Sequence, residues 1–338
     1  MLAAFGAFAL ALAAPVRADG PLFAVSEPVQ LTIRAPLGTL IHNRASNQLI
    51  AGTLTDPEGQ ALPVGIALRG ITRRTSEICE FPPLRIDFTT PPPANSLFAG
   101  QKKLKLVTHC RSAAEGQQDL LLEYAAYKLY NAMTPRSFRV RIANINYQDE
   151  RGRPIITRAG FFLEDVKDVA RRNGMREVHA GARIPVAFLA PDDAARYAMF
   201  QQMIGNHDWS MRAGPDGEDC CHNAKLIGVP GPGTVVPVPY DFDFSGLVDA
   251  PYAFPPEQLR INNVRQRLYR GFCTHNGEAV AAARQMRTIR PQIMGAFASA
   301  PGLEPAMRAK ATAYLDSFFA DIGADSDVKS RVLGTCLG

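Results

Sequence analysis

The chain changes character near residue 166, and this change limits the architectures open to it. Before that point, short segments rich in Leu, Ile and Val alternate with turn residues, a pattern typical of β-strands. Strands are predicted at 29–34, 49–54, 62–69, 84–88, 103–108, 138–147 and 161–166, with one helix at 119–133. After it, the apolar spacing predicts two short strands at 224–228 and 235–240 and helices at 191–204, 256–269, 278–298 and 304–322. A strand-rich half followed by a helix-rich half indicates an α+β fold with two lobes and a cleft between them.

The first 18 residues carry the features of a signal peptide. An unbroken run of apolar and small residues extends from Leu2 to Ala14, and Val16-Arg17-Ala18 supplies the small residues that a signal peptidase recognises. The run is shorter than the roughly 20 residues that a transmembrane helix needs. We therefore expect residues 1–18 to be removed. The mature chain should be exported to the periplasm or the extracellular space, without a transmembrane segment.

The charge pattern argues against one class of partner. The net charge is +5, and the basic residues are dispersed along the chain. A nucleic-acid groove needs its basic residues gathered in a patch or stripe. Nucleic acid is therefore not an expected partner.

Cysteine usage favours disulfides over a metal site. Six cysteines follow the predicted signal peptide, namely Cys79, Cys110, Cys220, Cys221, Cys273 and Cys336. An even count in an oxidising compartment favours disulfides, but six cysteines allow 15 pairings and the sequence does not choose among them. Cys220-Cys221-His222 also offers zinc ligands, yet adjacent cysteines rarely chelate one metal well.

Polar residues that chemistry would need gather in two stretches of the C-terminal half. Asn206, Asp208 and Asn223 lie at and beyond the end of a predicted helix, and Asp241 and Asp243 follow a predicted strand. Carboxylate and amide oxygens are the ligands of a hard cation such as Mg²⁺, which takes one or two carboxylates together with substrate phosphates. We therefore expect these side chains to converge on a magnesium–phosphate site.

One short motif suggests a different class of enzyme. Gly205-Asn206-His207-Asp208 resembles the G-N-H-D element of binuclear metallophosphoesterases. Those enzymes also need an upstream D-x-H motif and paired histidines, because two metals require many ligands. This chain has only six histidines, none of them paired, and no D-x-H. A metallophosphoesterase stays open as an alternative.

Four segments follow one another in the order found in a known family. Residues 120–133 with 137–148 come first, and residues 161–166 come second. Asn206-His207-Asp208 with His222-Asn223 comes third, and Tyr240-Asp241-Phe242-Asp243 comes fourth. Together they resemble the kinase-like fold of the spore-coat protein H (CotH) family and its relatives among the secretory-pathway kinases. In that family the segments are the helix and strand after the lysine strand, the inter-lobe connection, the N-x-D catalytic loop and the W-D-F-D metal element.

The resemblance implies a fold and a catalytic centre. The fold would be a two-lobed atypical protein-kinase-like fold, with a strand-rich N-lobe over 19–165 and a helical C-lobe over 166–338. Asp208, with Asn206 in the same loop, would accept the proton of an attacking hydroxyl. The residues that would hold Mg²⁺ or Mn²⁺ are Asn223, Asp241 and Asp243.

The resemblance also implies a nucleotide site. Lys105 would reach the phosphates of ATP or another nucleotide, with Glu123 as its ion-pair partner. Glu164, in the inter-lobe connection, would contribute to nucleotide binding. No glycine-rich phosphate loop is evident, although the basic segment 65–75 could serve as a substitute.

Two functions follow from this resemblance. The first is an exported phosphotransferase that acts on a protein or a cell-envelope acceptor. The second is a kinase-fold protein that has lost turnover and binds a ligand or partner. Fourteen residues separate Asp208 from Asn223, which is more than in kinase-type loops.

Overall fold

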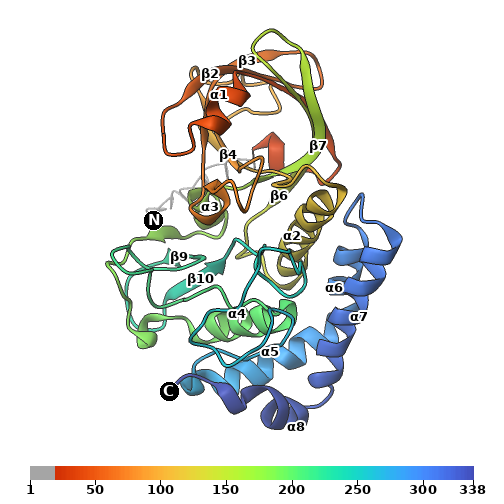
Figure 1. Ribbon diagram of the computed structural model, residues 1–338. Helices are drawn as coiled ribbons and strands as arrows, with labels where there is room; N and C mark the ends of the chain where they lie inside the picture. The colour runs from red at the N-terminus through yellow and green to blue at the C-terminus, as the bar shows by residue number, and fades with distance from the viewer. Residues whose placement is uncertain (1–19) are drawn as a thin grey trace, which may run out of the picture.

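The computed structural model describes residues 20–338 (Figure 1). The predicted signal peptide, residues 1–18, lies outside the described residues. The described part of the chain forms a β-barrel, a helix beneath the barrel, and a C-terminal half of helices and a small sheet.

The barrel contains the first seven strands. They are β1 (Val29–Arg34), β2 (Ile50–Thr55), β3 (Ala61–Leu68), β4 (Leu84–Phe88), β5 (Lys103–Val107), β6 (Val140–Gln148) and β7 (Pro154–Leu163). Their order around the barrel is β1-β2-β3-β4-β5-β7-β6. Neighbouring strands are antiparallel, except that β6 returns parallel to β1 and closes the sheet in the register Val29↔Ala143 to Arg34↔Gln148. The short helix α1 (Leu37–His42) follows β1.

Closure of the sheet makes the predicted two-lobed kinase-like fold wrong. Alternate residues of β1 point inward, where Val29, Leu31 and Ile33 are buried with apolar residues of the other strands. A closed barrel pairs every strand on both sides and leaves no open sheet edge. Six of the seven strands lie close to their predicted positions, whereas β7 begins at Pro154 and not at residue 161 as predicted. The parallel pairing of β1 with β6 joins segments more than a hundred residues apart.

Helix α2 (Ala114–Met133) connects the barrel to the C-terminal half. It packs against β7 and α6 and is buried on nearly every side, which fits a helix without a polar face (Figure 1). Its apolar side chains belong to the core of the C-terminal half rather than to the barrel interior.

The C-terminal half contains a three-stranded antiparallel sheet of order β10-β9-β8, which lies at one side of it (Figure 1). Its strands are β8 (Arg176–Val178), β9 (Ala224–Gly228) and β10 (Val235–Pro239). Its helices are α3 (Val166–Arg172), α4 (Pro191–Ile204), α5 (Asn276–Thr288), α6 (Arg290–Ala298), α7 (Pro305–Asp321) and the single turn α8 (Asp325–Asp327).

Two helix predictions for this half are wrong. Residues 256–269 form no helix. Arg267 in this segment instead donates hydrogen bonds to the backbone carbonyls of Met203 and Tyr314. The predicted helix 278–298 is divided into α5 and α6, because Pro291 lies in the first turn of α6 and has no N–H to continue the preceding helix.

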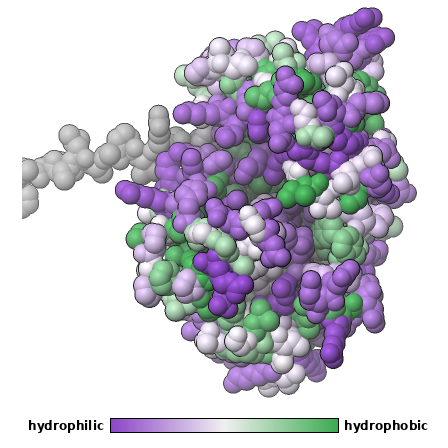
Figure 2. All heavy atoms as spheres, turned by 60° about the vertical axis from the view of Figure 1, so that its left-hand side comes forward, coloured by the Kyte–Doolittle hydropathy of each residue, from purple (hydrophilic) through white to green (hydrophobic). Residues whose placement is uncertain are grey.

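All six cysteines are paired, as the prediction of disulfides required. The disulfides are Cys79–Cys110, Cys220–Cys221 and Cys273–Cys336. Among residues 20–338, no helix has both the length and the apolar character needed to cross a membrane. On the face shown in Figure 2, hydrophilic residues predominate and apolar residues form small separate patches.

Candidate functional site

A pocket of about 430 Å³ lies where the barrel meets the C-terminal half. We call it the site pocket. Its walls come from the connection between β3 and β4, the loops on either side of Asp208 and Asn223, and the loop after β10. The charged and polar side chains on these walls include Arg69, Arg73, Asp208, His222, Asn223, Asp241 and Asp243. The structure therefore brings together the two polar stretches that the sequence singled out.

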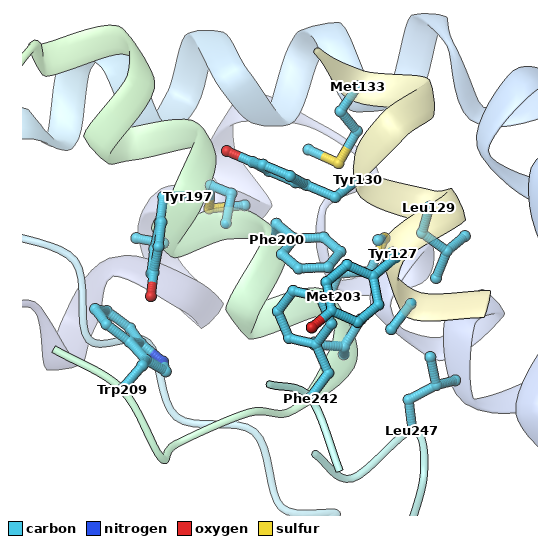
Figure 3. Close-up of a cluster of buried hydrophobic side chains, with 14 of the residues drawn as sticks. Tyr127, Leu129, Tyr130, Met133, Tyr197, Phe200, Met203, Trp209, Phe242 and Leu247 are labelled. Atoms are coloured by element: carbon cyan, nitrogen blue, oxygen red, sulfur yellow. The ribbon is translucent and has the colours of Figure 1, made fainter. Parts of the chain in front are cut away.

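The loop after β10 is fixed to helix α2. The ring of Phe242 is fully buried, with its centroid 4.5 Å from that of Tyr127 and 5.3 Å from that of Phe200 (Figure 3). The backbone N–H of Asp241 donates a 2.9 Å hydrogen bond to the hydroxyl of Tyr127. Because Phe242 is held in the core, the flanking carboxylates of Asp241 and Asp243 are held in the wall of the site pocket.

Three carboxylates converge at this wall. Ligand atoms of Glu123, Asp241 and Asp243 all lie within 4.8 Å of one another, and we call this group the carboxylate triad. Glu123 comes from α2, fully inside the protein at 2% exposure, and its Oε1 atom is buried without a hydrogen-bond partner. Burial raises the pKa of both Glu123 and Asp243, while the charge of Arg73 opposes that rise.

Arg73 lies among these three carboxylates. It belongs to the 3₁₀ turn η2 (Thr72–Arg74) between β3 and β4. Its Nη1 atom is 3.0 Å from Glu123 Oε2, its Nε atom is 3.3 Å from Asp243 Oδ2, and its Nη2 atom bonds Asp241 Oδ1. Burial opposes the charge on Arg73, but the three carboxylates outweigh burial and raise the pKa of the guanidinium.

The carboxylate triad fits a hard divalent cation. All of its ligand atoms are carboxylate oxygens, the donors that Mg²⁺, Mn²⁺ and Ca²⁺ prefer. The Glu123 Oε1 atom is a buried acceptor without a hydrogen-bond partner among the described residues, and a bound cation would satisfy it. One guanidinium also cannot neutralise three ionised carboxylates. The triad could therefore hold a metal ion, with Glu123 in place of the predicted Asn223.

Asp208 is held by a second set of hydrogen bonds across the site pocket. Its Oδ1 atom lies 2.7 Å from His222 Nε2, and its Oδ2 atom accepts a 3.0 Å bond from the Asn223 amide. The same amide donates to the Asp208 carbonyl at 2.7 Å, and the Asp208 N–H donates to Asn206 Oδ1 at 3.0 Å. The hydrogen bond to Asp208 raises the pKa of His222 despite the opposing effect of burial.

Two residues of the pocket have left-handed backbone conformations. The φ angle is +48° at Asn223 and +64° at Asp241. Asn and Asp tolerate this conformation better than other non-glycine residues, but it still costs free energy. Such conformations gather at functional sites, where the surrounding structure holds them in place. Both residues line the site pocket, which supports a functional role for it.

Lys105 and Glu164 are not placed as the resemblance implied. Glu123 pairs with Arg73 instead of Lys105. Lys105 lies on β5, where burial, together with the nearby charge of Arg69, lowers its pKa to about 8. Glu164 is buried in an ion pair with Arg172 at 3.1 Å and accepts a 2.9 Å bond from the Arg139 N–H, so its hydrogen bonds go to the protein.

The structure also adds residues that the sequence did not single out. His222, which the sequence offered only as a zinc ligand and as the neighbour of Asn223, lines the site pocket and contacts Asp208. Arg73 lies in the basic segment 65–75, but its partner Glu123 is fifty residues away, and no local pattern signals such a pair. His207, part of the phosphoesterase-like motif, places its Nε2 atom 2.8 Å from the Gln266 carbonyl and is almost fully buried.

Comparison with known proteins adds no family. Neither the models of known protein families nor the curated proteins include a match to this chain. The resemblance to the spore-coat protein H family therefore stays a prediction, and the geometry of the site pocket is the basis for assigning a function.

Proposed function

We propose that the chain is an enzyme that transfers a phosphoryl group with the help of a divalent cation bound by Glu123, Asp241 and Asp243. The observation that carries the proposal is the convergence of these three carboxylates within 4.8 Å at the wall of a pocket that also contains Asp208. The cation would be Mg²⁺ or Mn²⁺.

The chemistry of phosphoryl transfer suits such a pocket. The reaction requires little covalent work from the protein and depends on positioning and charge neutralisation. A cation on the carboxylate triad would neutralise phosphate oxygens when bound. Arg69 lines the same pocket and forms no ion pair within the described residues. It lies close to Lys105, as does Lys225, so positive charge is available for a phosphate chain.

Asp208 is the residue proposed to accept the proton of the attacking hydroxyl. Its two oxygens are oriented by His222 and Asn223, and Asn206 holds its backbone. A base held in one orientation raises the rate, because proton transfer requires hydrogen-bond contact with the reacting group. The phosphoryl donor would be ATP or another nucleotide, and the acceptor a protein or a component of the cell envelope.

A second function has a specific observation in its favour. Arg73 already occupies the space among the three carboxylates, so the cluster could be a permanent ion-pair network. The protein would then bind a ligand in the pocket without turnover. The two functions differ in whether a divalent cation binds the purified protein.

The proposal is tested with the variant Asp241→Asn, which keeps the size of the side chain and removes its charge. The matched control is Asp192→Asn, because Asp192 is exposed in the first turn of α4 and does not line the pocket. We expect isothermal titration calorimetry to show one Mn²⁺ bound to the wild-type protein and the control. Asp241→Asn should bind Mn²⁺ at least about 10-fold more weakly, as the loss of one charged ligand implies.

Transfer of radiolabelled phosphate from ATP provides the second readout of the same variants. We expect Asp241→Asn to lower the rate by about 100-fold or more, because the cation stabilises charge in the transition state. Folding of each variant is checked by circular dichroism. Wild-type protein that binds no Mn²⁺ would contradict the proposal, as would an Asp241→Asn variant that binds Mn²⁺ like the control.

A further inference from the structure

The position of Arg73 has a consequence for the proposed cation site. Its guanidinium contacts all three members of the carboxylate triad, and the residue is only 8% exposed. Each of the nitrogens Nη1, Nη2 and Nε contacts a different carboxylate. The side chain thus occupies the centre of the triad rather than its edge.

A divalent cation needs the same space. Mg²⁺ coordinates oxygen at about 2.1 Å, and Ca²⁺ at about 2.3–2.6 Å. Since the ligand atoms of the triad lie within 4.8 Å of one another, a cation that coordinates all three must lie between them. The guanidinium nitrogens are at 3.0 and 3.3 Å from the carboxylates of Glu123 and Asp243, in that same region. Two cations cannot share it, because they repel each other strongly at such a distance.

The surroundings of Arg73 allow its side chain to leave. Two residues before it, Ile71 is 75% exposed, and Gly70 has a φ angle of +87° with open space where a side chain would be. On the other side, Arg74 is held by the backbone carbonyls of Arg44 and Ser46. The chain is therefore held by hydrogen bonds after Arg73, whereas Gly70 and Ile71 before it are exposed to solvent. Arg69 and Thr72 line the site pocket on the route that the guanidinium would take.

We infer that Arg73 and a divalent cation compete for the carboxylate triad, and that cation binding moves the Arg73 guanidinium into the site pocket, where it pairs with an anionic ligand. The inference rests on the proposed cation site. It identifies the ligand as an anion such as a phosphate group. A displaced Arg73 would stand beside Arg69, and two unpaired guanidinium groups favour an anion with several acceptor oxygens.

Competition predicts that removal of Arg73 strengthens cation binding. The test variant is Arg73→Gln, and the matched control is Arg69→Gln, which removes the same charge from the same pocket without touching the triad. Mn²⁺ binding is measured by calorimetry. We expect Arg73→Gln to bind Mn²⁺ about 10-fold more tightly or better, because the cation no longer has to displace an occupant. Arg69→Gln should change the affinity by less than about 3-fold, since Arg69 forms no ion pair with the triad and acts on it only at a distance.

Phosphate binding tests whether the displaced Arg73 pairs with an anion. With the site saturated by Mn²⁺, inorganic phosphate is titrated into the wild-type protein and Arg73→Gln. We expect phosphate to bind the variant at least about 10-fold more weakly, because a charge-assisted pair is lost. Arg73→Lys serves as a second variant if Arg73→Gln fails to fold. It keeps the charge but cannot contact three carboxylates at once, so its Mn²⁺ affinity should exceed that of the wild type.

The outcomes separate the two proposals. If neither the wild type nor Arg73→Gln binds Mn²⁺, the proposed cation site is wrong and this inference falls with it. If the wild type binds Mn²⁺ and Arg73→Gln binds it no more tightly than Arg69→Gln does, only the competition is wrong. Equal phosphate affinity in the wild type and Arg73→Gln would overturn the release of Arg73 into the pocket.

Discussion

At the scale of single residues, the site pocket combines two kinds of charged group. Glu123 and Asp243 of the carboxylate triad are buried and Asp241 is about one-third exposed at the pocket, so the two buried charges need a counter-charge inside the protein. Asp208 and His222 are each about one-third exposed, so water screens their interaction. The buried group suits cation binding, and the half-exposed pair suits the exchange of protons with a substrate.

The pair of Asp208 and His222 predicts a pH-dependent contribution to stability. The hydrogen bond raises the pKa of folded His222 above its unfolded value of about 6.5. The pair therefore stabilises the fold fully below that pH, and its contribution is lost as pH rises through the raised folded pKa. We expect Asp208→Asn to lower the free energy of unfolding more at pH 6 than at pH 9, as measured by urea denaturation.

A matched variant isolates this effect. In a His222→Gln background, Asp208→Asn should cost the same at pH 6 and pH 9, because no group of the pair titrates between them. The hydrogen bonds from Asn223 to Asp208 are present at both pH values and cancel in the comparison. An equal cost of Asp208→Asn at both pH values in the wild-type background would show that His222 is not protonated by its contact with Asp208.

At the scale of elements, the site depends on how the loop after β10 is attached to α2. The single hydrogen bond from the Asp241 N–H to Tyr127 holds the backbone at the left-handed residue. We expect Tyr127→Phe to lower the free energy of unfolding by about 1 kcal/mol, the contribution of one partly buried hydrogen bond. Mn²⁺ affinity should fall as well, because Asp241 is less well held.

Tyr130, one turn along the same helix, is the control for this prediction. Its ring packs on Phe200, and its hydroxyl makes no hydrogen bond to any residue that the structure describes. Tyr130→Phe should therefore change stability by less than about 0.5 kcal/mol and leave Mn²⁺ binding unchanged. Chemical denaturation and calorimetry measure both variants. If the two substitutions have equal effects, the Tyr127 hydroxyl does not hold the loop.

Local patterns were sufficient for most elements but not for all. The alternation of Leu, Ile and Val placed β1 and β4 at their observed boundaries, and the acids after Pro191 placed α4. The apolar residues of 256–269 also suggested a helix. In the folded protein, Arg265 and Arg267 of that segment bind backbone carbonyls far away in the chain, and such contacts leave no periodic pattern in the sequence.

At the scale of the whole molecule, long-range pairing decided what the sequence could not show. The parallel pairing of β1 with β6 closes the barrel and rules out the kinase-like fold, although each strand was predicted. In the site, too, local patterns predicted some residues, whereas others depend on contacts between distant segments. Asp208, Asn223, Asp241 and Asp243 could be predicted to converge, because each lies beside the end of a helix or strand. The insertion of Arg73 among the carboxylates depends on how the barrel sits on α2, which has no local signal.

The disulfides predict unequal contributions to overall stability. Cys273–Cys336 joins residues 63 apart and Cys79–Cys110 joins residues 31 apart, whereas Cys220–Cys221 joins neighbours. Because a cross-link stabilises mainly by restricting the unfolded chain, removing either long link should cost about 4 kcal/mol, and removing the adjacent pair almost nothing. Paired Cys→Ser variants, compared by thermal unfolding, measure this. A large loss of stability on removing Cys220–Cys221 would contradict the explanation.

The central claim, a divalent cation held by Glu123, Asp241 and Asp243, is tested most directly by crystallography with Mn²⁺. Crystals grown with saturating Mn²⁺ are measured at a wavelength where manganese scatters anomalously. The account predicts one strong anomalous peak within about 2.1–2.4 Å of oxygens from all three carboxylates, with Arg73 displaced into the site pocket. A map with no peak there, and with Arg73 still bonded to the three carboxylates, would contradict it.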